Sequence, residues 1–239
     1  MKSIKLLCLL IFISTINICF AQANKVDSLS VEHIINKYIS SVGGSDNLLN
    51  VKDITTEMQG SVSGVDVKMT VYQKSPNKIL KEINAGAVRQ IILYDGTNAF
   101  MKIGKSQRKL SNQALEGLKY ESMTIFMLSL DELKIKTELL ANENIEGRNI
   151  YKVKLILPSG EEWIYFFDVE SGLKIKSLKT VYSPQGAFTQ TTFFSDYNSI
   201  NGINFPFNIK QTIGIQSLEF KVNSIKINTG LKDEIFKTE

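Results

Sequence analysis

The second half of this chain is a train of short strands separated by turn residues. Between Asn149 and Ile227 the segments with strand character are NIYKVKLIL, EEWIYFFD, LKIKSLKTVY, AFTQTTFFSDY, NFPFNIKQT and LEFKVNSIKI, and the first three turns are PSG, VESG and SPQG. Short strands at this spacing predict an antiparallel sheet, because tight turns join strands that pair with each other. A long meander closes into a barrel, a sandwich or a curved sheet, whose concave face is a natural place for a ligand.

The first half adds a hairpin whose register follows from its turn. Ser63-Gly64 has the composition of a two-residue hairpin turn. Because side chains alternate along a strand, the apolar residues of both strands then share one face. The predicted pairs are Val62 with Val65, Gly60 with Val67, Met58 with Met69 and Thr56 with Val71. Further strands are expected at about 78–84, 88–94 and 97–103.

Two stretches have the spacing of helices. The first carries an apolar stripe, with Ser28 or Ser30 as its N-cap and Gly43-Gly44 at its end. The stripe consists of Val31, Ile34, Ile35, Tyr38, Ile39 and Val42. The second begins at Ser111 and runs through Leu115, Leu118, Met123, Ile125, Phe126, Met127 and Leu128. Methionine adapts to partners of different shape, so this stretch is either ordinary core or the wall of a site for a variable apolar ligand.

The segment WIYFF is apolar on both faces, which is typical of a central strand. A three-residue loop at Pro158–Gly160 would place Trp163, Tyr165 and Phe167 on one face, whereas a two-residue loop would place them on the other. The three-residue register pairs Leu157 with Glu161, Leu155 with Trp163, Val153 with Tyr165 and Tyr151 with Phe167.

The first residues have the pattern of a secretory signal peptide. Lys2 and Lys5 precede an apolar run, and Ala21 fits a small-residue cleavage site. We therefore expect a signal peptide over residues 1–21, a single mature domain over 22–239 and a periplasmic location. A retained anchor, or a lipid on Cys19, is the lesser alternative. Both cysteines, Cys8 and Cys19, lie in the removed segment, so we expect no disulfide in the mature chain.

Composition excludes several kinds of chemistry. The formal charge is +4, and Lys2 and Lys5 contribute two of these charges. The remaining basic residues are scattered, which argues against nucleic acid as a partner. His33 is the single histidine and the mature segment lacks cysteine, so His-rich zinc sites and Cys-His dyads are excluded. No phosphate-binding or nucleophile-elbow motif is present, and Glu161 and Glu162 point to opposite faces. We expect no enzymatic activity, no cofactor and no metal.

The chain resembles the LolA and LolB lipoprotein-carrier and lipoprotein-sorting superfamily, including sorting-like domains appended to some exported zinc peptidases. The resemblance covers nearly the whole mature chain. It rests on VEHIINKYISSVGG, TTEMQGSVSGVDVKMTVYQKSPNKILKE, ILYDGTNAF, FFDVESGLKIK and FFSDYNSINGINFPFNIK.

This resemblance implies an α+β fold that is mainly antiparallel β. It would be a curved, incomplete β-barrel of about 11–13 strands, with helices plugging an apolar cavity on the concave face. In the carriers, an arginine shortly before a proline on an early strand helps to latch the helical lid. Here the matching stretch is QKSPNK, with Lys74 and an additional serine before Pro76. Lysine lacks the planar fork of arginine.

We therefore expect a monomeric, non-catalytic periplasmic carrier or binding protein that holds an acyl chain, a lipid or a lipoprotein tail in this apolar cavity. The residues expected to line its cavity are Met58, Met69, Val71, Leu115, Leu118, Phe126, Met127, Trp163, Tyr165 and Phe167, with Lys74 in the latch region. The alternative is a structural or interaction module that works beside an envelope protein or peptidase and fills its cavity with its own side chains. The third hypothesis is an enzyme, which would need an acid pair or metal ligands in that cavity.

Overall fold

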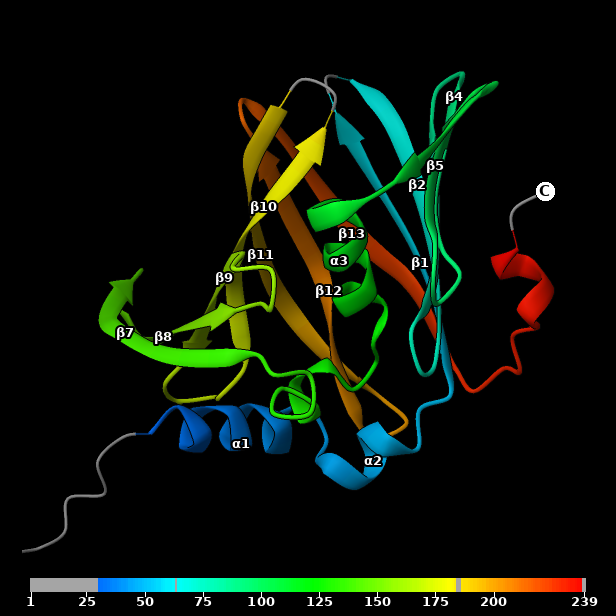
Figure 1. Ribbon diagram of the computed structural model, residues 1–239. Helices are drawn as coiled ribbons and strands as arrows, with labels where there is room; N and C mark the ends of the chain where they lie inside the picture. Colours follow the sequence, from blue (N-terminus) through cyan, green and yellow to red (C-terminus); the bar gives the residue numbers. More distant parts are fainter. Residues whose placement is uncertain (1–29, 63, 184–185, 238–239) are drawn as a thin grey trace, which may run out of the picture.

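The computed structural model describes residues 30–62, 64–183 and 186–237. It contains one antiparallel sheet of thirteen strands that curves around a central helix, as Figure 1 shows. The sheet ends at two strands that do not pair with each other, so the barrel stays open. The predicted incomplete, mainly antiparallel barrel with helices on its concave face is therefore confirmed.

The strands follow chain order in two runs, and the first strand pairs with the last to join the runs. From one edge to the other they are β6 (Ser106–Leu110), β5 (Ala99–Ile103), β4 (Val88–Tyr94), β3 (Lys78–Ala85), β2 (Val65–Lys74), β1 (Asp53–Val62), β13 (Gln216–Ile227), β12 (Ile203–Ile213), β11 (Gly186–Ile200), β10 (Lys174–Ser183), β9 (Glu162–Asp168), β8 (Arg148–Ile156) and β7 (Lys136–Ile145).

Both hairpin registers are confirmed. In β1 and β2, Met58 is opposite Met69 and Thr56 is opposite Val71. In β8 and β9, Val153 is opposite Tyr165, and the Leu157 N–H donates to the Glu161 carbonyl (2.9 Å), as the three-residue loop requires. The strands β6 and β7 were not predicted.

Helix α1 (Val31–Ser41) lies across one end of the curved sheet beside the short α2 (Ser45–Leu49), as Figure 1 shows. The Ser30 hydroxyl accepts from the His33 N–H (3.1 Å), so Ser30 is the N-cap. Gly43 ends this region with φ +129°, and a Cβ there would lie 2.4 Å from the Gly202 carbonyl oxygen. Only glycine fits this close approach.

The second helical stretch is shorter than predicted. Helix α3 (Asn112–Ser122) stops at Met123, whose backbone is extended with ψ 116°. The 3₁₀ helix η1 (Phe126–Leu128) follows as a separate turn. Figure 1 places α3 inside the curve of the sheet, while η1 lies nearer to α1. The prediction of one continuous helix from Ser111 to Leu128 was therefore wrong, and its two halves contact different parts of the sheet.

The C-terminal 3₁₀ helix η2 (Asp233–Phe236) packs on the outer, convex face (Figure 1). Adjacent residues of β3 show the two faces. Ile79 packs with Leu118 of α3, whereas Leu80 packs with Phe236 of η2.

The predicted signal peptide, its cleavage near Ala21 and both cysteines lie outside the described residues, as do Ser63 and the Pro184-Gln185 turn. Within the described part of the chain, no helix has the length and apolar character needed to cross a membrane.

Candidate ligand-binding site

The predicted lining residues are divided among three clusters of apolar side chains on the concave face. The first, beneath α1 and η1, contains Phe126, Trp163, Tyr165 and Phe167, with Met127 packed against it. The second, beneath α3, contains Leu118, with Leu115 and Val71 packed against it. The third, on β1, β2, β12 and β13, contains Met58 with Met69 and Val71. Val71 therefore links two clusters, and the ten residues are spread over all three.

A pocket of about 270 Å³ lies in the first cluster, between α1, η1 and β9. Four predicted residues line it, namely Phe126, Met127, Trp163 and Tyr165. The other residues that line it are Tyr38, Val42, Leu48, Tyr120, Glu121, Met123, Thr124, Ile125, Leu128 and Lys174.

Aromatic rings form the wall of this pocket. On β9, Trp163 and Tyr165 stack with centroids 6.4 Å apart, and Tyr165 meets Phe167 edge to face at 6.3 Å. Phe126 covers Trp163 at 5.8 Å. Trp163 donates its indole N–H to Glu161 Oε1 (2.8 Å), which satisfies its polar atom. The alternation of β9 thus builds an apolar wall from every second residue.

Helix α1 is anchored over this wall by long-range hydrogen bonds. The Lys37 Nζ donates to the Val169 carbonyl (2.6 Å), and the Ser41 hydroxyl donates to the Ser171 carbonyl (2.7 Å). The Tyr38 ring then lies 5.2 Å from the Phe167 ring. One side of the pocket is therefore fixed to the β9–β10 turn.

A charged group on the same concave face contributes Glu121 to the lining of the pocket. Glu121, near the end of α3, pairs through Oε2 with Lys81 of β3 (2.5 Å) and through Oε1 with Lys179 of β10. Burial lowers the pKa of Lys81 to about 8, and burial together with the charge of Lys81 lowers that of Lys179 to about 7. Two lysines share one carboxylate, so the group is electropositive when both are protonated.

Lys174 is a further cation on the concave face; it is half-buried and lines the pocket itself. Its ammonium lies 4.3 Å from the Tyr165 ring centroid and 4.8 Å from that of Phe194. Burial lowers its pKa to about 8. Among the described residues, no acidic side chain forms an ion pair with Lys174.

Sequence reasoning missed these lysines, although the sequence contains a signal for one of them, Lys81. The register of the first hairpin places Val71 on the apolar face, and β3 continues that face with Ile79, Lys81 and Ile83. A lysine in phase with apolar neighbours indicates a cation on a buried face.

The carboxylate pair considered in the sequence, Glu161 and Glu162, does not act together. Glu162 pairs with Lys154 (3.2 Å), whereas Glu161 bonds Trp163. Burial raises the pKa of Glu161, and the charge of Glu116 raises it further. His33, the single histidine, is exposed on α1, and within the described ranges no group of three potential ligands surrounds a metal position.

Lys74, the residue expected in the latch region, contacts the C-terminal segment. Its Nζ lies 2.9 Å from Asp233 Oδ1 and donates to the Leu231 carbonyl (2.7 Å). The lysines that pair with α3 are Lys81 and Lys179. The latch at Lys74 stays a prediction, and in this structure the side chain secures the chain leading into η2.

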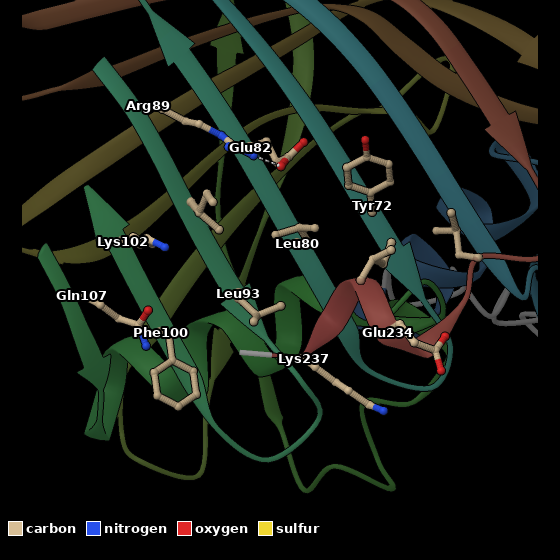
Figure 2. A pocket seen from close by; sticks show the side chains of 13 residues that line it. Tyr72, Leu80, Glu82, Arg89, Leu93, Phe100, Lys102, Gln107, Glu234 and Lys237 are labelled. Atoms are coloured by element: carbon tan, nitrogen blue, oxygen red, sulfur yellow. Dashed lines mark hydrogen bonds and ion pairs between the residues drawn. The ribbon is translucent and has the colours of Figure 1, made fainter. Parts of the chain in front are cut away.

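A larger groove of about 570 Å³ lies on the convex face beside η2. Figure 2 shows Leu80, Leu93 and Phe100 along its floor, with Arg89 bonded to Glu82 (2.6 Å) and Lys102 and Lys237 at its margins. An acyl chain needs apolar enclosure, and this groove is lined by several charged groups. The smaller concave pocket is therefore the better candidate, despite its size.

These features define a class of fold, an open antiparallel half-barrel with helices on its concave face. The same fold occurs in a LolA superfamily protein from Nitrosomonas europaea, which is 14% identical with a TM-score of 0.57 over 88% of this chain and 99% of that one. An outer membrane lipoprotein-sorting protein domain from Vibrio parahaemolyticus is 12% identical with a TM-score of 0.56 over 86% and 95%. A DUF1329 family protein from Desulfovibrio piger is 13% identical with a TM-score of 0.57 over 87% and 97%.

The chain thus has the fold of LolA superfamily proteins, and identities this low establish the fold alone. No sequence family matches the chain. No curated protein matches it by sequence.

Proposed function

We propose that this protein is an exported, non-catalytic binding protein that holds an acyl chain of a lipid or lipoprotein against the concave face of its sheet. The observation that carries the proposal is the pocket between α1, η1 and β9, whose wall is built from Phe126, Met127, Trp163 and Tyr165. The proposal includes a periplasmic location and one mature domain over residues 22–239. The fold shared with a lipoprotein-sorting domain supports it.

The volume of the pocket limits the length of acyl chain that it can hold without a conformational change of the protein. At about 30 Å³ per water molecule, the 270 Å³ volume equals roughly nine waters. This space suits part of one chain, and each buried methylene contributes about 0.8 kcal/mol. A longer chain requires η1 or α3 to move away from the sheet.

A second function rests on a different observation. Several predicted lining residues are already covered by their own neighbours, since Met58 is 7%, Leu118 8% and Phe167 1% exposed. A concave face filled in this way favours a structural or interaction module of the envelope. The two functions differ in whether the pocket accepts an added apolar molecule.

Energy transfer from Trp163 tests the proposal. Trp163 is the single tryptophan of the chain and lines the pocket, so a neutral apolar fluorophore bound there quenches its emission. We expect saturable quenching by N-phenyl-1-naphthylamine at one probe per protein. Quenching that grows linearly with probe and never saturates would favour the self-filled module.

A further inference from the structure

We propose that the pocket recognises the charged end of its ligand, and that Lys174 binds the carboxylate of a single-chain fatty acid. This inference rests on the proposed function. The proposal concerns the chemical class of the ligand, a monoanionic acyl chain, and gives Lys174 the role of its counter-ion. It starts from the position of the Lys174 side chain in a pocket whose other lining residues are aromatic and aliphatic, apart from Thr124 and Glu121.

The first step is electrostatic. Lys174 and Glu121 are the charged residues that line the pocket, and both carboxylate oxygens of Glu121 are engaged by Lys81 and Lys179. The ammonium of Lys174 contacts only ring faces among the interactions described for it. An anion entering the pocket therefore meets an available cation and a neutralised carboxylate. Charge-assisted bonds of this kind are the strong ones.

The second step concerns the groups around Lys174. Tyr38 and Tyr165 line the same pocket as Lys174. Tyr197 donates its hydroxyl to the Lys174 carbonyl (2.6 Å) and so fixes the backbone of β10 at this point. Burial raises the pKa of Tyr38 to about 12, so it stays a phenol that can donate to a carboxylate.

The third step is size. A volume of 270 Å³ takes a carboxylate and the first part of one chain. A phospholipid, with two chains and a glycerophosphate group, needs a larger site. The aromatic wall from Tyr165 to Trp163 then continues away from Lys174 along β9, where the apolar chain would lie.

A matched control is present two residues along the same strand. Lys176 also lies over aromatic rings, 4.5 Å from the Phe166 centroid and 5.6 Å from that of Phe193. Phe166 alternates with Tyr165 and Phe167 on β9, so it faces the opposite side of the sheet. Lys176→Met removes a comparable cation from outside the pocket.

The experiment is displacement of bound N-phenyl-1-naphthylamine by dodecanoate and by methyl dodecanoate, which have equal chains and differ in charge. We expect dodecanoate to displace the probe from the wild-type protein at roughly ten- to hundredfold lower concentration, as a hydrogen-bonded charge pair provides. Lys174→Met should abolish this preference, Lys174→Arg should retain it in part, and Lys176→Met should leave it unchanged.

Equal displacement by acid and ester in the wild-type protein would overturn the inference, as would a preference that survives in Lys174→Met. Stronger displacement by dodecyl phosphate than by dodecanoate would overturn the assignment to a carboxylate. Probe binding by Lys174→Met shows that this variant is folded. Absence of saturable probe binding in every variant is a separate result, because it contradicts the proposed function itself.

Discussion

Lys81 of β3 and Glu121 of α3 form an ion pair of 2.5 Å inside the curve of the sheet, and the second oxygen of Glu121 contacts Lys179 of β10. In the sheet, β3 and β10 are separated by five strands. The ion pairs therefore connect two distant parts of the half-barrel through the end of α3. Gln73 of β2 adds a hydrogen bond to the Glu121 carbonyl (2.9 Å).

Removing the charge of Glu121 should destabilise the protein. Glu121→Gln leaves two lysines on the concave face without a counter-ion, and the side chains of Lys81 and Lys179 are only 21% and 19% exposed. A fully buried pair would cost about 3–5 kcal/mol when broken, and partial exposure reduces this to about 1–3 kcal/mol. Urea unfolding at pH 7 measures the difference.

The control for Glu121→Gln is Glu138→Gln. Glu138 is 51% exposed, and its partner Lys154 also pairs with Glu162. An exposed pair of this kind contributes little, so we expect a change below about 0.5 kcal/mol. Equal effects of the two substitutions would contradict the role given to Glu121.

Lys174 should make stability depend on pH in a defined direction. Its pKa is lowered by burial to about 8, below the value of about 10.4 in an unfolded chain. Between these values the unfolded chain binds more protons than the folded chain. The free-energy cost of burying the charged Lys174 therefore applies in full below pH 8, and it disappears as the pH rises to about 10.4. The effect of Lys174→Met on the free energy of unfolding should therefore be more stabilising at pH 7 than at pH 10, by about 1–3 kcal/mol.

Urea unfolding of both proteins at the two pH values gives this difference. The other titratable groups that line the pocket with Lys174 are Tyr38, Tyr120, Tyr165 and Glu121, and they are common to both proteins. A stabilisation that is the same at pH 7 and pH 10 would show that the pKa of Lys174 is not lowered.

Asp53 should hold the chain that leads to η2. It is 3% exposed, and its carboxylate accepts bonds from the N–H groups of Thr229 (2.7 Å), Gly230 (2.9 Å) and Leu231 (3.3 Å). Burial raises the pKa of Asp53, but these bonds outweigh it and leave the pKa below its ordinary value. We expect Asp53→Asn to cost about 1–3 kcal/mol at pH 7.

The stability lost on Asp53→Asn should be smaller at acid pH. A carboxylate with a lowered pKa contributes stability above the unfolded value of about 3.9, and that contribution is lost as the pH falls below it. Asp233→Asn is the control, because Asp233 is 53% exposed in its pair with Lys74. Urea unfolding at pH 7 and pH 3 tests both variants, and a larger loss from Asp233→Asn would refute this account of Asp53.

Met127 should decide whether an apolar ligand enters the pocket. Met127→Asp places a carboxylate in the lining of the pocket, and burying it beside a neutral ligand is costly. We expect the affinity for N-phenyl-1-naphthylamine to fall by at least about tenfold. Met101→Asp, on β5 in the cluster beneath α3, should leave that affinity unchanged. Circular dichroism checks that both variants are folded.

Local signals were enough to predict the hairpins. The turns around Gly64 and Gly160 have lengths that fix which residues are opposite each other, and alternation then assigns each side chain to a face. The stripe of α1 was equally clear, because its apolar residues recur with helical spacing. Asp95 and Asp168, each beside a turn that contains glycine, also accept hydrogen bonds from backbone N–H groups of their own turns.

The arrangement of the site depends on contacts that no local signal carries. Met58 and Trp163 were expected in one cavity, but the pairing of β1 with β13 places Met58 in a different cluster from Trp163. Met123 breaks the second helical stretch, which moves Phe126 away from Leu118. Lys81, Glu121 and Lys179 are far apart in sequence, so their meeting follows only from the order of the strands.

The most direct test of the acyl-binding account is mass spectrometry of the lipids extracted from this protein after purification from its native envelope. The account predicts a defined acyl-bearing molecule, enriched over a control protein purified in parallel, that is lost from Met127→Asp and kept in Met101→Asp. Recovery of no acyl-bearing molecule above the control, from protein that folds and unfolds cooperatively, would contradict it.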